Sequence, residues 1–130
     1  GCGSGILAIA SLLLGAEKAV GVDIDALAVK TAKENGEVND LREPEYTVFQ
    51  GNLTDKVEGK FDVVVANIVA DVIIMFCKDV AKFMKDGGVF ITSGIIDTRE
   101  QDVIDAFDKY GFKIKARHTK GGWVCFETEV

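Results

Sequence analysis

The chain has 130 residues, of which 48% are hydrophobic, and this size and composition fit one compact domain with a substantial core. Its formal net charge of −6 argues against a surface that grips nucleic acid, because that affinity comes mainly from Lys and Arg neutralising phosphates. No apolar run approaches the roughly 18 residues of a membrane-spanning helix, and no signal-peptide pattern is visible, so we expect neither nucleic acid nor a membrane as a direct partner.

Short runs rich in Val and Ile alternate with longer helical segments. In the first half, the pattern predicts a buried helix over residues 4–14, a strand over 18–24, a helix over 26–35 ending near Gly36, and a strand over 46–49. In the second half, it predicts an apolar strand over 61–66 and a helix over 70–84 that is closed by residues 85–88. A strand over 89–93, an acidic helix over 99–110 and strands over 112–117 and 123–128 follow.

This alternation predicts an α/β fold with a doubly wound, mostly parallel sheet and helices on both of its faces. The strand over 61–66 is apolar almost throughout, as expected for a parallel strand that is covered on both sides. Only a short loop separates the last two strands, so we expect them to pair as an antiparallel hairpin at the C-terminal end of the sheet.

The chain opens on a glycine-rich turn, Gly1-Cys2-Gly3-Ser4-Gly5, directly before an apolar helix. Such a loop lets the backbone approach a ligand closely and presents N–H groups at a helix N-terminus. It normally follows a central β-strand, and none precedes it here. We therefore expect residues 1–130 to be an N-terminally truncated domain that lacks its first central strand.

An acid at the end of the next strand, Asp23, follows Gly5 by 18 residues. That is where a carboxylate accepts hydrogen bonds from the ribose hydroxyls of a nucleotide-type cofactor. A dinucleotide fingerprint would read G-x-G-x-x-G, but Ile6 stands where its third glycine belongs. The spacing G-x-G-x-G is more typical of methyltransferases than of NAD enzymes.

Four motifs carry a more specific resemblance. The run GCGSGILAIASLLLGAEKAVGVDIDALAVKTAKEN resembles the cofactor half of class I S-adenosylmethionine-dependent methyltransferases, which have a Rossmann-like fold. The later runs ANIVADVI, KDGGVFITSGII and GGWVCFE are similar to the catalytic domain of the ribosomal protein L11 methyltransferase family. Together they cover essentially the whole chain.

The resemblance implies a role for each matching residue. Gly1, Gly3 and Gly5 would shape the loop around the methionine moiety of S-adenosylmethionine, and Asp23 would bind the ribose. Ile24 would pack against the adenine, while Asn52 and Leu53 would contact its edge. The superfamily often has aspartate at the position of Asn52, so this chain departs from that pattern. Asn67 would lie beside the methyl group, where it would contact the cofactor and orient the nucleophile.

The resemblance also implies methylation of the α-amine and lysine amines of ribosomal protein L11, recognised through a separate N-terminal domain. Asn67 can accept a hydrogen bond from an amine but is no strong base, which favours orientation over general-base catalysis. Enzymes that methylate planar nitrogens typically carry an Asn/Asp-Pro-Pro-aromatic motif here, whereas Asn67 is followed by Ile-Val-Ala. A methyltransferase for another protein or small molecule and a non-catalytic fragment remain the alternatives.

Other polar and aromatic residues favour structural roles. Cys2, Cys77 and Cys125 form no C-x-x-C pair and His118 is the only histidine, so we expect no metal site and a reducing, cytoplasmic setting. Cys2 has no histidine nearby to activate it as a nucleophile. Trp123 is expected to pack in the core or at an edge, with substrate stacking as the alternative.

Overall fold

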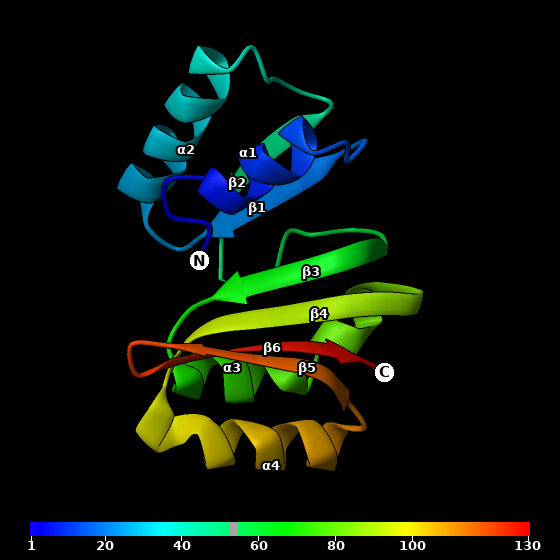
Figure 1. The fold of residues 1–130 in the computed structure, drawn as a ribbon. Helices are drawn as coiled ribbons and strands as arrows, with labels where there is room; N and C mark the ends of the chain where they lie inside the picture. Colours follow the sequence, from blue (N-terminus) through cyan, green and yellow to red (C-terminus); the bar gives the residue numbers. More distant parts are fainter. Residues whose placement is uncertain (53–54) are drawn as a thin grey trace. The chain divides into compact units, whose positions relative to one another are not determined.

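The computed structural model describes residues 1–52 and 55–130, which form two compact units, Gly1–Val57 and Glu58–Val130 (Figure 1). No helix in these described ranges has both the length and the apolar character needed to cross a membrane.

The first unit is a two-stranded parallel sheet with two helices. Its elements in chain order are α1 (Ile6–Leu13), β1 (Ala19–Asp23), α2 (Ala26–Val38) and β2 (Tyr46–Gln50). β1 and β2 run in register from Ala19 opposite Tyr46 to Asp23 opposite Gln50. Side chains from α1, α2 and β2 share one core, so both helices pack on the same face of this sheet. The core consists of Ile9, Val29, Ala32, Tyr46 and Val48.

The prediction that the first helix is buried is wrong for most of its surface. Ile9 is its only fully buried residue, while Ile6 and Leu13 are more than 60% exposed and Leu14, directly after the helix, is 88% exposed. A two-stranded sheet offers one narrow apolar face, and this face covers only one side of α1. The apolar sequence alone could not reveal how much partner surface the helix would meet.

The prediction that the second helix ends near Gly36 is also wrong, because α2 continues to Val38. Gly36 is buried, and a Cβ atom added there would overlap the ring of Tyr46 on β2. The glycine therefore allows close packing between helix and strand and does not act as a stop signal.

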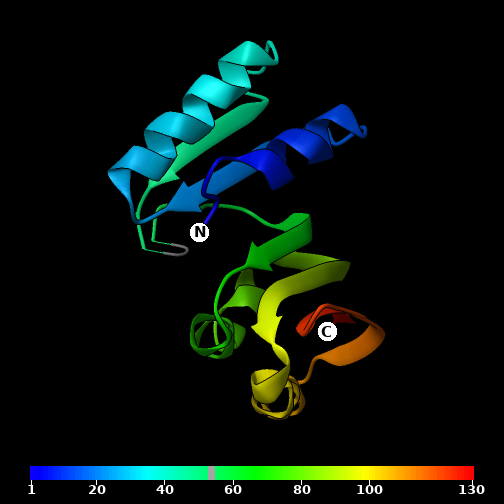
Figure 2. The same ribbon diagram turned by 60° about the vertical axis from the view of Figure 1, so that its left-hand side comes forward.

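The second unit is a four-stranded sheet with helices along one face (Figure 2). Its elements are β3 (Phe61–Asn67), α3 (Ala70–Cys77), the 3-10 turn η1 (Val80–Phe83), β4 (Met84–Ile96), the 3-10 turn η2 (Asp97–Arg99), α4 (Glu100–Tyr110), β5 (Lys113–Lys120) and β6 (Trp123–Glu129). The strand order is β3-β4-β6-β5, with β3 and β4 parallel and the other two pairs antiparallel. The predicted α/β fold class and the C-terminal hairpin are confirmed.

Five phenylalanines form the core between this sheet and its helices. Phe76 meets Phe90 edge-on at 5.8 Å between ring centroids, and Phe107 meets Phe126 in the same way at 5.5 Å. Such edge-to-face pairs stabilise a core beyond the area they bury. The fifth ring, Phe112, lies against Phe90 and Phe107.

The expectation that the strand over 61–66 is covered on both faces is wrong within the described structure. Val64 and Ala66 lie opposite Phe90 and Thr92, on the side of the phenylalanine core. Val63 and Val65 alternate with them and are 50% and 39% exposed. Because successive side chains of a strand point to opposite faces, Val63 and Val65 lie on the second face of this sheet, where they remain partly exposed.

The third helix is shorter than predicted and does not end at residues 85–88. α3 ends at Cys77, and Lys85 to Gly88 lie inside β4. Phe61 pairs with Met84 and Val63 with Val89, so the longer stretch of β4 must bulge out between these pairs. Gly87 has a φ of +75° there, a conformation that glycine adopts without strain.

Replacing Gly36 by Ala should destabilise the first unit, although alanine favours helices. The new methyl group would overlap the buried Tyr46 ring, and such overpacking costs about 1–3 kcal/mol. Alanine gains only ~1 kcal/mol over glycine in a helix, at the low end of that cost. We expect urea denaturation of Gly36→Ala to give a free energy of unfolding that is lower by up to about 2 kcal/mol. The exposed neighbour variant Glu37→Ala should stay within about 0.5 kcal/mol, and equal stability of the two variants would contradict the packing role.

Candidate functional site

The glycine-rich loop is a tight turn that leads into α1. Gly3 and Gly5 have φ values of +54° and +82°, in the left-handed region that other residues rarely adopt. The Gly5 N–H donates to the Cys2 carbonyl at 2.9 Å, and the Gly5 carbonyl accepts from the Ile9 N–H at 2.9 Å. Gly5 thus both closes the turn and begins the helix.

Two side chains that the sequence pattern did not single out hold this loop in place. Asn35 on α2 donates through Nδ2 to the Ser4 carbonyl at 2.8 Å. Tyr46 lies buried against Gly5 and donates through its hydroxyl to the Ala32 carbonyl at 2.8 Å. A Cβ atom at Gly5 would overlap that hydroxyl. Both residues are distant from the loop in sequence, so no local motif indicates them.

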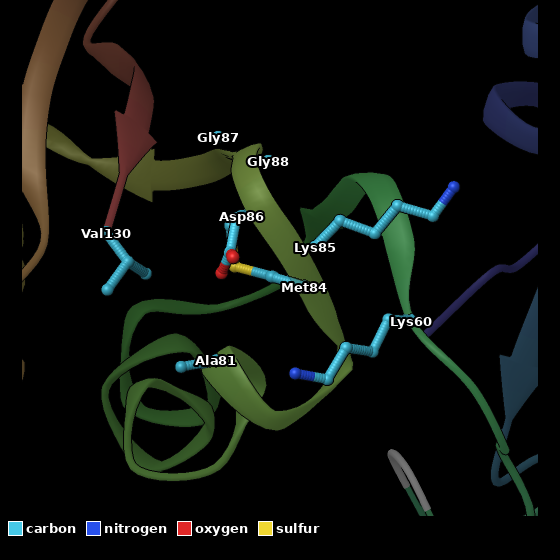
Figure 3. A pocket seen from close by; sticks show the side chains of 8 residues that line it. All are labelled: Lys60, Ala81, Met84, Lys85, Asp86, Gly87, Gly88 and Val130. Carbon is cyan, nitrogen blue, oxygen red and sulfur yellow. The ribbon is translucent and has the colours of Figure 1, made fainter.

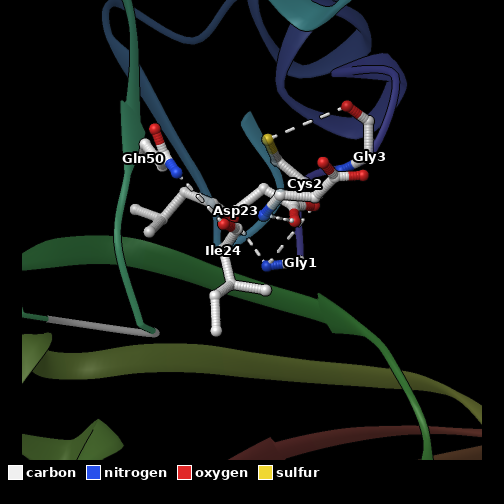
Figure 4. Close-up of polar contacts among 8 residues, drawn as sticks. Gly1, Cys2, Gly3, Asp23, Ile24 and Gln50 are labelled. Atoms are coloured by element: carbon white, nitrogen blue, oxygen red, sulfur yellow. Dashed lines mark hydrogen bonds and ion pairs between the residues drawn. The ribbon is translucent and has the colours of Figure 1, made fainter. Parts of the chain in front are cut away.

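Asp23 connects the loop to the end of β1, as Figure 4 shows. Its Oδ2 accepts the Gly3 N–H at 2.9 Å, and its Oδ1 accepts the Asp25 N–H at 3.0 Å. The Cys2 N–H also donates to the Val22 carbonyl at 2.8 Å, which fastens the loop to the same strand.

Asp23 is buried, with 9% of the residue exposed, and its carboxyl group is stabilised in the charged form. Burial raises the pKa of this group, but the N–H groups of Asp25 and Gly3, the positive charge of the Gly1 amino group and the N–H of Ile24 together outweigh burial, so its pKa lies below the usual value. Each carboxylate oxygen can accept more than one hydrogen bond, which leaves capacity for hydroxyl donors of a ligand.

The residues after β2 lie next to Asp23. The Gly51 N–H donates to the Asp23 carbonyl at 3.0 Å, and Gln50 donates through Nε2 to the Ile24 carbonyl at 3.4 Å. Ile24 is 70% exposed and Asn52 is exposed as well. The structure therefore brings the loop glycines, Asp23, Ile24 and Asn52 to one edge of the first unit, at the carboxyl ends of its parallel strands. Leu53 lies outside the described residues.

This edge is where ligands bind in open α/β sheets, and a family comparison agrees with the sequence motifs. The family described as Ribosomal protein L11 methyltransferase (PrmA) matches residues 1–130. The chain belongs to this family. The motif-based resemblance is thus confirmed over its whole length.

Curated members of the L11 methyltransferase family are close in sequence but longer. The chain is 50% identical over 125 residues to "Ribosomal protein L11 methyltransferase" of Clostridium botulinum (strain Eklund 17B / Type B), which covers 96% of the chain and 39% of that relative. It is 50% identical over 126 residues to the protein of the same name from Desulforamulus reducens, covering 97% and 41%. The chain thus spans about two fifths of the length of these relatives.

A solved structure supports the same assignment. The ribosomal protein L11 methylase of Lactobacillus delbrueckii subsp. bulgaricus superposes with a TM-score of 0.95 at 30% identity, covering 99% of this chain and 66% of that one. The family relationship therefore holds for the fold as well as for the sequence.

Asn67, the residue predicted to orient the nucleophile, belongs to the second unit and is described there by itself. It ends β3, is exposed, and lies in register with Ser93 on β4. The next N–H, that of Ile68, donates to the Ser93 carbonyl at 3.3 Å. Asn67 thus lies at the carboxyl end of a parallel strand, the end at which open α/β sheets bind ligands, and its role stays a prediction.

Cys2 lies half-buried in the glycine loop. Burial raises the pKa of its thiol, and the charge of Asp23 raises it further. A thiol with a raised pKa is a poor nucleophile, so this finding agrees with the structural role expected from the sequence.

The pocket in Figure 3 lies in the second unit and contains none of the predicted site residues. Its volume is about 250 Å³, and it is lined by Lys60, Ala81, Met84, Lys85, Asp86, Gly87, Gly88 and Val130. Lys85, one of the two lysines that line this pocket, donates from Nζ to Asp62 Oδ2 at 3.1 Å, so its charge is already paired.

Among the residues that the structure describes, no group of His, Cys, Asp or Glu is arranged to hold a metal ion.

The lowered pKa of Asp23 predicts a loss of stability in acid. Its carboxylate is stabilised in the folded chain, so this contribution is present above the unfolded pKa, near 3.8, and is lost as the pH falls through the lower folded pKa. In thermal melts from pH 7 to pH 2, Asp23→Asn should be less stable at neutral pH, by about 1–3 kcal/mol, and lose less on acidification. Asp40→Asn, at an exposed position of the same unit, should follow the unsubstituted chain. Parallel acid profiles for Asp23→Asn and the unsubstituted chain would contradict the role of this carboxylate.

Proposed function

We propose that residues 1–130 are the catalytic domain of an S-adenosylmethionine-dependent N-methyltransferase that acts on amino groups of ribosomal protein L11. The observation that carries the proposal is the family match over the whole chain, which includes every residue of the glycine loop, Asp23 and Asn67. The relatives are more than twice as long as this chain. From the family resemblance, we assign recognition of L11 to a separate N-terminal domain.

The residues of the first unit fit the cofactor. A Cβ atom added at Gly3 would meet nothing within 4 Å, so the loop leaves open space beside its backbone where a ligand can lie. We assign Gly1, Gly3 and Gly5 to the methionine moiety and the Asp23 carboxylate to the ribose hydroxyls. Ile24, Asn52 and Leu53 are assigned to the adenine; the exposed Ile24 side chain is suited to cover an apolar ring face.

The assignment leaves little acid–base chemistry to the protein. When bound, S-adenosylmethionine supplies a methyl group that is already activated by its positively charged sulfur. The protein must hold a neutral amine in line with it, which is a task of positioning. We propose that the Asn67 carbonyl oxygen accepts a hydrogen bond from the amine and so directs its lone pair.

The two proposed kinds of amine differ in how readily they become neutral. An α-amino group has an ordinary pKa of about 7.7–8.0, so a sizeable fraction is neutral at pH 7. A lysine amine, with an ordinary pKa of about 10.4, must first lose its proton through desolvation or to solvent. We therefore expect the rate on lysine amines to rise more steeply between pH 7 and pH 9 than the rate on the α-amine.

We also propose a cytoplasmic location. The ribosomal substrate that we propose supports it, and the three cysteines, which are free thiols in the described structure, agree with it.

Removing the Asp23 carboxylate should weaken cofactor binding. Hydrogen bonds to a charged group contribute about 1.5–3 kcal/mol, so the Kd of S-adenosylhomocysteine should rise on the order of tenfold to a hundredfold in Asp23→Ala of the full protein. Isothermal titration calorimetry measures this change, with Glu37→Ala as an exposed control on the same unit. An unchanged Kd would refute the ribose role.

The same titration tests the alternative of an inert fragment. If residues 1–130 alone bind no detectable S-adenosylhomocysteine while the full protein binds it, the chain is insufficient as a cofactor-binding domain.

Deletion of the gene should remove methyl groups from L11. Intact-mass and peptide mass spectrometry of ribosomal proteins from a deletion strain should show loss of multiples of 14 Da on L11, located on its α-amine and lysine amines. Unaltered L11 together with a loss on another protein would favour the alternative substrate.

A further inference from the structure

The strand next to Asn67 contains a bulge at Ser93 and Gly94. Thr92 pairs with Phe126 and Ile95 with Val124, so two residues of β4 lie opposite the single residue Cys125 of β6. Gly94 has a φ of +76°, in the left-handed region. Bulges of this kind bend a strand and redirect side chains, and they are common next to active sites.

Gly94 lies directly against the side chain of Asn67. A Cβ atom built on Gly94 would stand 2.6 Å from the Asn67 Oδ1, 3.0 Å from the Ile68 carbonyl oxygen and 3.2 Å from the Ile68 nitrogen. Real Cβ atoms essentially never lie within 3.0 Å of another heavy atom. The direction that every other L-residue fills with a side chain is therefore occupied by the Asn67 carboxamide.

The two sides of this contact differ in how easily they can move. The Ile68 atoms in this contact belong to the backbone, and the Ile68 N–H donates a hydrogen bond to the Ser93 carbonyl at 3.3 Å. The Asn67 carboxamide is the end of an exposed side chain and can rotate. Rotation of Asn67 would therefore relieve the shortest contact of a methyl group at position 94, while the contacts with the Ile68 backbone at 3.0 and 3.2 Å call for a much smaller shift.

We propose that Gly94 is a positioning residue: because it has no side chain, the Asn67 carboxamide oxygen can take the orientation that receives the acceptor amine. The inference rests on the proposed role of Asn67. Its physical basis is that alignment errors near 1 Å lower the rate of an in-line transfer by about a hundredfold.

Gly87 provides a matched control on the same strand. Its φ of +75° is nearly that of Gly94, but a Cβ atom there would meet nothing within 4 Å. Alanine at either position has a similarly unfavourable φ, but only alanine at position 94 meets Asn67 and the Ile68 backbone. Differences between Gly94→Ala and Gly87→Ala therefore report these contacts, and a double variant with Asn67 separates the carboxamide from the backbone.

The experiment measures kcat and KM for L11 methylation by the full protein, with purified L11 and radiolabelled S-adenosylmethionine, together with the Kd of S-adenosylhomocysteine. We expect Gly94→Ala to lower kcat on the order of tenfold to a hundredfold with the Kd within about twofold. Gly87→Ala should keep kcat within about twofold. An unchanged kcat in Gly94→Ala, or an equal loss in both variants, overturns the inference.

The double variant Gly94→Ala/Asn67→Ala separates positioning from general damage. If Gly94 acts only through Asn67, the kcat of the double variant should equal that of Asn67→Ala alone. A kcat lowered by the product of the two single losses would overturn the inference.

If Gly94→Ala instead fails to fold, the double variant should fold, because the clashing carboxamide is gone. A double variant that also fails to fold places the clash on Ile68 and overturns the inference. If Asn67→Ala itself keeps full kcat, the proposed role of Asn67 fails, and this result is distinct from one in which only Gly94→Ala is silent.

Discussion

The packing of Tyr46 is the constraint on which the first unit depends. Its ring lies so close to Gly36 on α2 and to Gly5 at the start of α1 that neither position has room for a side chain. Its hydroxyl is satisfied by the Ala32 carbonyl, so the polar end is buried without an unpaired donor. One residue of β2 thus sets the distance of both helices from the sheet, and with it the place of the glycine loop.

The glycine loop and Asp23 depend on each other in the same way. The Gly3 N–H satisfies a carboxylate that burial would otherwise push toward its neutral form, and the carboxylate in turn fixes the loop over the end of β1. A ligand that approaches this edge meets a carboxylate already charged and oriented. For the proposed cofactor, little of the binding free energy would then be lost in ordering these groups, which is the benefit of preorganisation.

The sequence predicted the fold class and most strands because these depend on local pattern, and the candidate site residues were proposed from the glycine loop, Asp23 and the family resemblance. The loop, Asp23 and Asn67 each stand at the boundary of a strand or helix, and such boundaries can be recognised from alternating apolar runs. The end of α3 and the extent of β4 were not predictable in this way. Residues 85–88 carry an ordinary helix-stop pattern, but they lie inside β4, in the stretch that bulges out between the pairs Phe61–Met84 and Val63–Val89.

Glycine illustrates the same limit most clearly, because its meaning depends on what lies across from it. Gly36 lies in a helix because the ring of Tyr46 on the next strand leaves no room for a side chain there. Gly87 has a left-handed φ in the bulge of β4, where a side chain would meet nothing within 4 Å. Gly94 has the backbone conformation of Gly87 but faces the carboxamide of Asn67. No local rule distinguishes these three glycines, since a side chain is excluded at each for a different reason. In each of the two units, the absence of a side chain therefore matters for packing as much as the side chains that are present: Gly36 makes room for the Tyr46 ring, and Gly94 makes room for the Asn67 carboxamide.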